Sequence, residues 1–239
     1  MTALDNAIRE LEAALEQVQA IAADDVLHLW QILATDLGDG EPVDPQAIIA
    51  ALQEHLPGVV TGWAGIVADD TATWYRELAP EEKFTATVPP DLIAPERIAA
   101  SISWAVNTAT TAQTAIAQLQ GSVHRAIADA QRETVAYNAS REQVRYRRHC
   151  GYSACTWCLV MAGRGAVYKS SKSAVRGHDS CRCLAVPERR GMTDYTVPPL
   201  VREAEAKYAD AARALSAEGV ASPSLQAIIA KMDALAAAT

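Results

Sequence analysis

The sequence predicts a mainly α-helical protein with an extended helical N-terminal region, a long central helix, a small α+β Cys/His module and C-terminal helices. Three observations favour this class. Half of the 239 residues are hydrophobic with a single phenylalanine, and alanine, the strongest helix former, is abundant. Apolar residues recur at helical spacings over long stretches. Four of the five cysteines fall in one short segment. We therefore expect an acidic helical region, a long helix, a Cys/His core and C-terminal helices, at residues 1–95, 96–148, 149–190 and 191–239.

The N-terminal region carries the first helical patterns. A stripe of apolar residues predicts one helix, or two in succession, over residues 2–35. The stripe consists of Leu4, Ile8, Leu11, Leu15, Val18 and Ile21. Asp44 is typical of a helix N-cap, and Pro57 is expected to end the helix that begins there. A further helix is expected over residues 61–78, followed by a proline-rich linker in which KFTATV alternates as a short strand would.

The central and C-terminal regions show longer helical patterns. From Ile98 to Tyr146 there is no proline and one glycine, Gly121, so one long helix is expected, with a break near Gly121 as the alternative. The stripe in this segment is rich in small residues, so neighbouring helices can approach it closely. Two terminal helices are expected around residues 200–217 and 223–237, separated by glycine and proline.

The Cys/His core has the spacing of a metal site. Cys155 and Cys158 form a Cys-x-x-Cys turn, and His178 stands three residues before Cys181. Two such pairs can direct four soft donors to one tetrahedral ion, for which zinc is the default. We predict that Cys155, Cys158, His178 and Cys181 are the ligands, because the second pair repeats the spacing of the first. Cys183 is the alternate ligand.

Two other interpretations of the cysteines stay open, namely buried free thiols and disulfides. The start of the chain has no signal-peptide pattern, which favours a reducing compartment and disfavours disulfides. If a metal is bound, the ligands are in surplus, and no His-Glu-x-x-His motif is present. A catalytic zinc keeps a position open for water, so we expect a closed, structural zinc site.

The charge is distributed unevenly along the chain. The formal net charge is −8, but residues 1–96 carry −15 and residues 97–239 carry +7. The segment 141–190 alone carries +8, with eleven basic residues. This polarity suits a contact with nucleic acid or an acidic protein surface, although the two charged parts could instead face each other. The candidate contact residues are Arg145, Arg147, Arg148, Arg164, Lys169 and Lys172. No apolar run approaches the ~20 residues needed to cross a bilayer, so no membrane partner is expected.

The motifs of the Cys/His core resemble a known family. The stretch ACTWCLVMAGRGAVYKS…GHDSCRCLAVP is similar to the core of MuF-type minor head proteins of tailed phages, in the variant found in phages of actinobacteria. The close match is confined to this stretch, and the rest of the chain agrees only in being helical. The matching positions are Cys155, Cys158, Arg164, Gly165, Tyr168, His178, Cys181, Cys183 and Pro187.

The resemblance implies a minor capsid protein inside the phage head, present in the host cytoplasm during assembly and associated with the portal protein. Its expected role is head morphogenesis, supporting capsid assembly and DNA packaging or ejection. Packaged DNA, scaffold and major capsid protein are further candidate partners. The alternatives are a zinc-ribbon nucleic-acid-binding protein and a capsid maturation protease.

A protease would need a nucleophile and a base. No Gly-x-Ser-x-Gly elbow is present, and neighbouring residues such as His178, Asp179 and Ser180 rarely adopt the geometry of a triad. A cysteine protease could pair Cys150 or Cys181 with a histidine, either His149 or His178. We expect no enzymatic activity.

Overall fold

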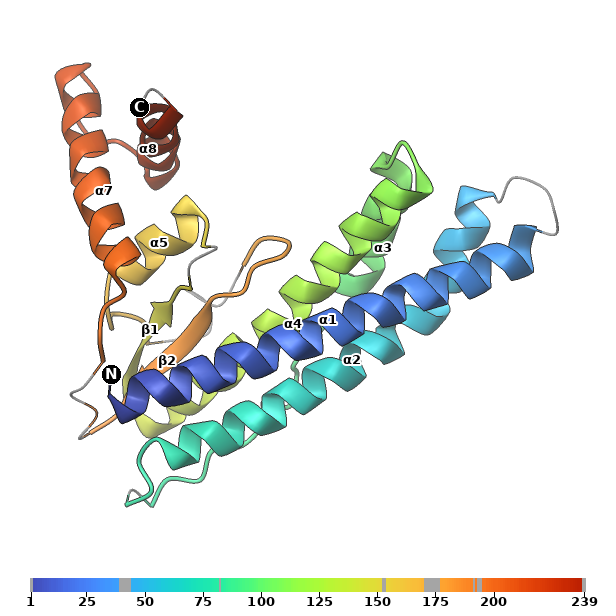
Figure 1. Ribbon diagram of the computed structural model, residues 1–239, viewed down its shortest axis with the longest axis horizontal. Helices are drawn as coiled ribbons and strands as arrows, with labels where there is room; N and C mark the ends of the chain where they lie inside the picture. The colour runs from blue at the N-terminus through green and yellow to red at the C-terminus, as the bar shows by residue number, and fades with distance from the viewer. Residues whose placement is uncertain are drawn as a thin grey trace.

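The computed structural model describes residues 2–38, 44–81, 83–151, 154–169, 177–190, 192 and 195–237. As predicted, the protein is mainly helical. Among the described residues, four helices build an elongated scaffold, and a two-stranded sheet and three further helices lie at one end of it (Figure 1). The scaffold helices are α1 (Ala3–Gly38), α2 (Pro45–Glu77), α3 (Pro95–Thr108) and α4 (Ala112–Glu142). The other elements are β1 (Arg145–His149), α5 (Thr156–Gly163), β2 (Leu184–Glu188), α7 (Pro199–Ala217) and α8 (Leu225–Ala237).

Helices α1, α2 and α4 pack against one another along the scaffold (Figure 1). The apolar stripe of α1 is continuous, so α1 is one helix, and its members Ile8 and Leu15 are buried. They join one core with the buried faces of α2 and α4, which include Leu52, Leu56 and Ile127. Burying such a side chain contributes about 1.5–3 kcal/mol. None of the described helices is long and apolar enough to span a bilayer.

The expected end of a helix at Pro57 is wrong, because α2 runs through this proline to Glu77. The predicted start is confirmed, since the Asp44 side chain accepts a hydrogen bond from the backbone of Gln46. A proline inside a helix costs about 3 kcal/mol. Here the fully buried Leu56 and Val60 on either side of it belong to one core, so burial outweighs the cost of the proline.

The expected single long helix over residues 96–148 is also wrong. It is two helices, α3 and α4, followed by strand β1, and the helices part at residues 109–111 rather than at Gly121. Thr111 is the N-cap of α4 and accepts a hydrogen bond from Thr114. At the other end, Gln143 takes a left-handed conformation (φ 61°) that turns the chain into β1.

The segment KFTATV forms no strand in its described residues. It lies along α4 instead, where Asn138 donates to the Thr87 carbonyl at 2.8 Å and accepts from the Thr87 amide at 2.9 Å. A side-chain amide on a helix therefore supplies the hydrogen bonds that a neighbouring strand would provide.

Strands β1 and β2 are antiparallel, with Arg147 opposite Val186, and β2 packs on α4. Tyr168 adds an isolated bridge to Tyr146. Helices α5, α7 and α8 form their own small apolar cluster, which includes Val160 of α5. The sheet and α5 thus meet between the scaffold and the C-terminal helices (Figure 1).

Candidate metal centre

Two segments bring the predicted ligands together. Cys155 is the N-cap of α5, and its sulfur accepts a hydrogen bond from the backbone amide of Cys158 at 3.5 Å. The N-terminal turn of α5 therefore presents both thiols. The loop before β2 supplies the other three donors. Nε2 of His178 lies 2.8 Å from Sγ of Cys155, and Sγ of Cys181 lies 3.7 Å from Sγ of Cys158. Sγ of Cys183 lies 3.0 Å from Sγ of Cys181.

Gly121 explains how this loop reaches the centre of the molecule. A Cβ at Gly121 would lie 3.3 Å from Cβ of Asp179 and from Oγ of Ser180. The loop crosses α4 at this point, and the Ser180 amide donates to the Gly121 carbonyl at 3.0 Å. The glycine thus marks a close approach of two segments rather than a helix break.

The donors form two triads that share Cys158. One triad is Cys155, Cys158 and His178, and the other is Cys158, Cys181 and Cys183. Within each triad all ligand atoms lie within 4.8 Å of one another. The chain therefore holds a Cys/His cluster that is able to bind a metal ion.

The spacing of the donors can be compared with that of a zinc site. Sulfur ligands about 2.3 Å from a tetrahedral zinc ion lie about 3.8 Å apart. Sγ of Cys158 lies 3.7 Å from Sγ of Cys181 and 3.8 Å from Nε2 of His178. Sγ of Cys183 is closer, at 3.0 Å from both Cys158 and Cys181. Around Cys158 these distances fit Cys181 better than Cys183. Sγ of Cys155 and Nε2 of His178, at 2.8 Å, lie closer together than two ligands of one tetrahedral ion, and the four predicted ligands are divided between the two triads.

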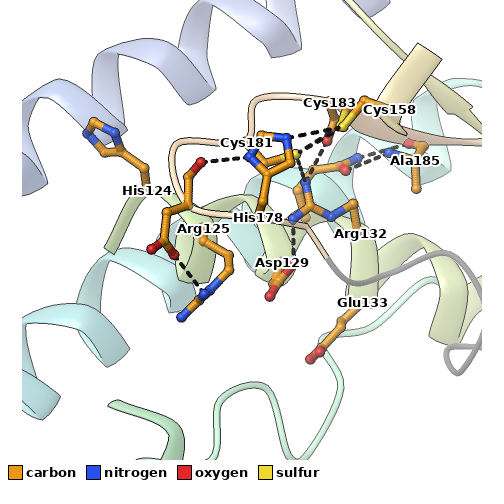
Figure 2. A network of polar contacts seen from close by, with 12 residues as sticks. His124, Arg125, Asp129, Arg132, Glu133, Cys158, His178, Cys181, Cys183 and Ala185 are labelled. Atoms are coloured by element: carbon orange, nitrogen blue, oxygen red, sulfur yellow. Dashed lines mark hydrogen bonds and ion pairs between the residues drawn. The ribbon is translucent and has the colours of Figure 1, made fainter. Parts of the chain in front are cut away.

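Two buried arginines contact the sulfurs. Arg148 of β1 donates to Sγ of Cys183 at 2.7 Å and lies 3.7 Å from Sγ of Cys181. Arg132 of α4 donates to the Cys183 carbonyl at 2.7 Å and lies 3.6 Å from Sγ of Cys181. Both side chains are fully buried. Arg132 also donates to Asp129 on the previous turn of α4, and this contact links the cluster to the scaffold (Figure 2).

The thiols differ in acidity. A hydrogen bond from Cys158 and the nearby His178 lower the pKa of the Cys155 thiol to about 5. Hydrogen bonds from three neighbouring thiols, together with the charge of Arg148, hold the pKa of Cys183 well below its usual range. Burial lowers the pKa of Arg148, but the charge of the neighbouring thiolates raises it overall. Hydrogen bonds with the neighbouring thiols raise the pKa of Cys158, and although its bond with Cys158 lowers the pKa of Cys181, the bond with Cys183 and burial raise it overall. Without an ion, Cys155 and Cys183 are therefore the acidic thiols of the cluster, and binding of a metal by Cys158 or Cys181 must release a proton.

A cleft of about 430 Å³ opens beside the cluster. Its other wall is formed by α1, with Glu12 and Glu16. Glu16 pairs with Arg182 at 3.1 Å, and Glu12 lies 3.4 Å from His149. The α1 helix thus closes over the loop that carries the second pair of ligands, and the cleft leaves a path by which an ion reaches the cluster.

The predicted basic contact residues differ in how far their side chains are exposed. Arg145, Arg164 and Lys169 are exposed, whereas Lys172 lies outside the described residues. Arg147 is mostly buried and pairs with Glu188 at 2.9 Å. The assignment of Arg148 to a surface contact is wrong, because its side chain is fully buried among the thiols.

The suggested protease residues are arranged as follows. Cys150 is buried and donates to the Cys158 carbonyl at 3.2 Å, while His149 contacts the hydroxyl of Tyr195 at 2.9 Å. The closest Cys–His pair is a different one, Cys155 and His178, with Sγ and Nε2 2.8 Å apart.

Sequence reasoning missed Arg132, Asp129 and the role of Gly121. Asp129 and Arg132 stand three residues apart in a stripe of small apolar residues, and this spacing was the available signal. Arg147 and Arg148 are neighbours on strand β1, so their side chains point to opposite faces of the sheet. The same residues fit a basic helix end equally well. Only the observed strand therefore shows which of the two arginines is buried.

The comparisons with known proteins gave one match. The profile of a protein family described as VG15 protein matches residues 2–211. Neither a search of curated proteins nor a search of solved structures found a match. The matched segment includes the whole scaffold, the Cys/His cluster and most of α7.

Proposed function

The chain belongs to the VG15 protein family, a phage-associated family, and on this premise we propose that it is a structural minor head protein of a tailed phage. In this proposal it resembles the MuF type, lies inside the head, associates with the portal protein and supports capsid assembly and DNA packaging or ejection. One zinc ion, held by Cys155, Cys158, His178 and Cys181 with Cys183 as the alternate ligand, fastens its Cys/His core.

The observation that carries the structural role is the position of the cluster. Two of the donors come from the start of α5, which packs on α7 and α8, and the other three, of which Cys183 is the alternate ligand, come from the loop that crosses α4. One ion bound to both segments joins the C-terminal helices to the scaffold. Because the ion is tied to two segments with surplus donors, it stabilises the fold rather than activating a water molecule.

The exposed charges support a portal or DNA contact at one end of the protein. Arg145, Arg164 and Lys169 are exposed near the Cys/His core. The outer sides of α1 and α2 carry exposed acidic residues instead, among them Glu10, Glu16, Asp24, Glu54, Asp69 and Asp70. The exposed basic residues at the core therefore suit an acidic portal surface or DNA, and the exposed acidic sides of α1 and α2 suit a basic surface.

Metal analysis tests the zinc proposal. We expect one zinc ion per chain in protein purified without chelator. Removing it should make α5, α7 and α8 accessible to hydrogen exchange, while α1 and α2 keep their protection. Cys158→Ser should lose the ion, and Cys150→Ser, which changes another buried thiol of the same segment, should keep it. If the purified protein carried no metal and were unaffected by chelation, a structural zinc ion that joins the C-terminal helices to the scaffold would be ruled out.

Assembly experiments test the head role. We expect the protein to co-purify with the portal protein and to be present in mature heads. Replacing Arg145, Arg164 and Lys169 by glutamine should weaken the portal interaction, or flatten the salt dependence of DNA binding if DNA is the partner. Heads that form and package DNA normally without this protein would contradict the proposal.

The capsid maturation protease is the second candidate, favoured by the short contact between Cys155 and His178 at the start of a helix. A cysteine next to an imidazole and a helix N-terminus is the arrangement of an activated nucleophile. Incubation with a coat-protein precursor separates the two: cleavage that Cys155→Ser abolishes supports the protease, and an intact precursor supports the structural role.

A further inference from the structure

The surplus sulfur of the Cys/His cluster lies close to two others. Sγ of Cys183 is 3.0 Å from Sγ of Cys158 and 3.0 Å from Sγ of Cys181. Two sulfur ligands of one tetrahedral zinc ion lie about 3.8 Å apart, and Cys158 and Cys181 are close to this separation at 3.7 Å. Since a disulfide bond is about 2.05 Å long, a shift of about 1 Å would bring the sulfur of Cys183 into bonding distance of a neighbour.

Two disulfides of Cys183 are within reach, and they differ in what they join. A bond to Cys181 would close around the single residue Arg182 and stay within one loop. A bond to Cys158, 25 residues away in the sequence, would join this loop to the first turn of α5. The bond that closes the longer loop restricts the unfolded chain more, so it stabilises the folded protein more. The pair Cys158–Cys183 is therefore the favoured disulfide.

The cleft beside the cluster gives a small oxidant access to this pair. Its volume is about 430 Å³, and both Cys158 and Cys183 line it. The two residues are only 1% and 4% exposed, so their sulfurs are reached by a molecule as small as hydrogen peroxide. Cys155 is partly exposed and meets the oxidant as well. A sulfenic acid formed there condenses with a neighbouring thiol, and disulfide exchange passes the bond on to the most stable pair.

We propose that Cys158 and Cys183 are a redox modification site, at which a peroxide links the two sulfurs in a disulfide and the cluster releases its metal ion. With both sulfurs written as thiols, two S–H bonds and the O–O bond of hydrogen peroxide break, and one S–S bond and two O–H bonds form. The two sulfurs together give up two electrons, and peroxide is reduced to two water molecules. The disulfide depends on the sulfur geometry alone, whereas the release of an ion rests on the zinc site of the proposed function.

The position of Cys158 accounts for both effects of the disulfide. Cys158 belongs to both donor triads, so either ligand set loses a donor when its sulfur is bonded to Cys183. The disulfide also joins the same two segments as the ion, the start of α5 and the loop before β2. The C-terminal helices therefore stay fastened to the scaffold when the ion is released. With its fifth donor the cluster keeps this link under reducing conditions, where a metal site persists, and under oxidising ones, where a disulfide does.

The test oxidises the zinc-loaded full chain with one equivalent of hydrogen peroxide. We expect the free thiols to fall from five to three and one ion per chain to pass to a chromogenic chelator. A peptide map under non-reducing conditions should show Cys158 linked to Cys183. Hydrogen exchange of α5, α7 and α8 should stay slow in the oxidised protein, in contrast to reduced protein stripped by chelation. Cys183→Ser should form no such link, and the matched control Cys150→Ser, which changes a buried thiol that donates to the Cys158 carbonyl, should form it as the native chain does.

The outcomes separate this inference from the proposed function. A native chain without bound metal that still links Cys158 to Cys183 refutes the zinc site and supports the redox site. A zinc-loaded chain in which peroxide forms a different disulfide, or none, refutes the redox site and leaves the zinc site intact. Oxidised protein whose C-terminal helices exchange as fast as those of the chelated chain would overturn the claim that the disulfide takes over the link. Should Cys183→Ser fail to fold, the peptide map of the native chain decides by itself.

Discussion

Replacing Asp129 by asparagine tests the link between the scaffold and the Cys/His cluster. Asp129 lies on α4 with its side chain 3% exposed, and Arg132, with which it pairs, is fully buried (Figure 2). The substitution keeps the shape of the side chain and removes its charge. Arg132 would then stay buried without its carboxylate partner, although it keeps the Cys183 carbonyl at 2.7 Å.

The expected loss of stability in Asp129→Asn follows from the burial of the pair Asp129–Arg132. Removing one partner of a buried ion pair costs about 3–5 kcal/mol. Two unit charges 4 Å apart interact with about 4 kcal/mol at an effective dielectric constant of about 20, which gives the same size. Asp129 also contacts Arg97 at 3.1 Å, but Arg97 is half exposed, so this second pair contributes about 1 kcal/mol at most.

The assay is urea-induced unfolding at pH 7, with zinc-loaded and zinc-stripped protein measured separately. Asp129→Asn should lower the free energy of unfolding by about 3–5 kcal/mol, and the matched control Arg97→Gln by about 1 kcal/mol or less. Because Arg132 positions the loop that carries Cys181 and Cys183, Asp129→Asn should also weaken zinc binding. The reasoning fails if the two variants lose equal, small amounts of stability.

Three further predictions follow from other parts of the structure. Burial, and then the charge of Asp129, raise the pKa of Glu133 to about 7 from 4.5, so its stabilising contribution is complete below pH 4.5 and is lost as the pH rises through about 7. In chemical denaturation, Glu133→Gln should therefore be as stable as the native protein at pH 4. At pH 8 it should be more stable by about 1–2 kcal/mol, a value reduced for solvent screening. Equal stabilities of the two proteins at pH 8 would contradict this. Gly62→Ala on the open side of α2 should raise stability by about 0.5–1 kcal/mol. In Gly177→Ala the new Cβ would lie 2.6 Å from Arg132 and 2.9 Å from Cys181, so this variant should be less stable and bind zinc more weakly. A Gly177→Ala variant with unchanged stability would show that the loop can shift. Glu142→Gln should lower the free energy of unfolding by about 3–5 kcal/mol, because it leaves the buried Arg189 without its carboxylate. Replacing both Glu142 and Arg189 by methionine should lower it much less. A double-mutant cycle measures the difference.

The cluster illustrates what could be predicted about the site. The Cys-x-x-Cys and His-x-x-Cys spacings predicted that two short segments each present a pair of donors, and the structure brings donors from both segments together around Cys158. Spacing could not rank Cys181 against Cys183, because both are within reach and their distances from Cys158 depend on how the loop crosses α4. The charged side chains were harder still, since Arg148 belongs to the most basic segment of the chain and yet lies at the centre of the thiol cluster.

The sequence by itself determined the helical class, the start of α2 at Asp44, the two terminal helices and the gathering of the cysteines, because periodicity, capping and ligand spacing are local properties of the chain. Only the tertiary structure decided that α2 continues through Pro57, that the central segment breaks before Thr111 and that Gly121 is a crossing point. It also decided which arginines are buried. Each of these depends on partners far away in the chain, whose burial and charge outweigh the local preference.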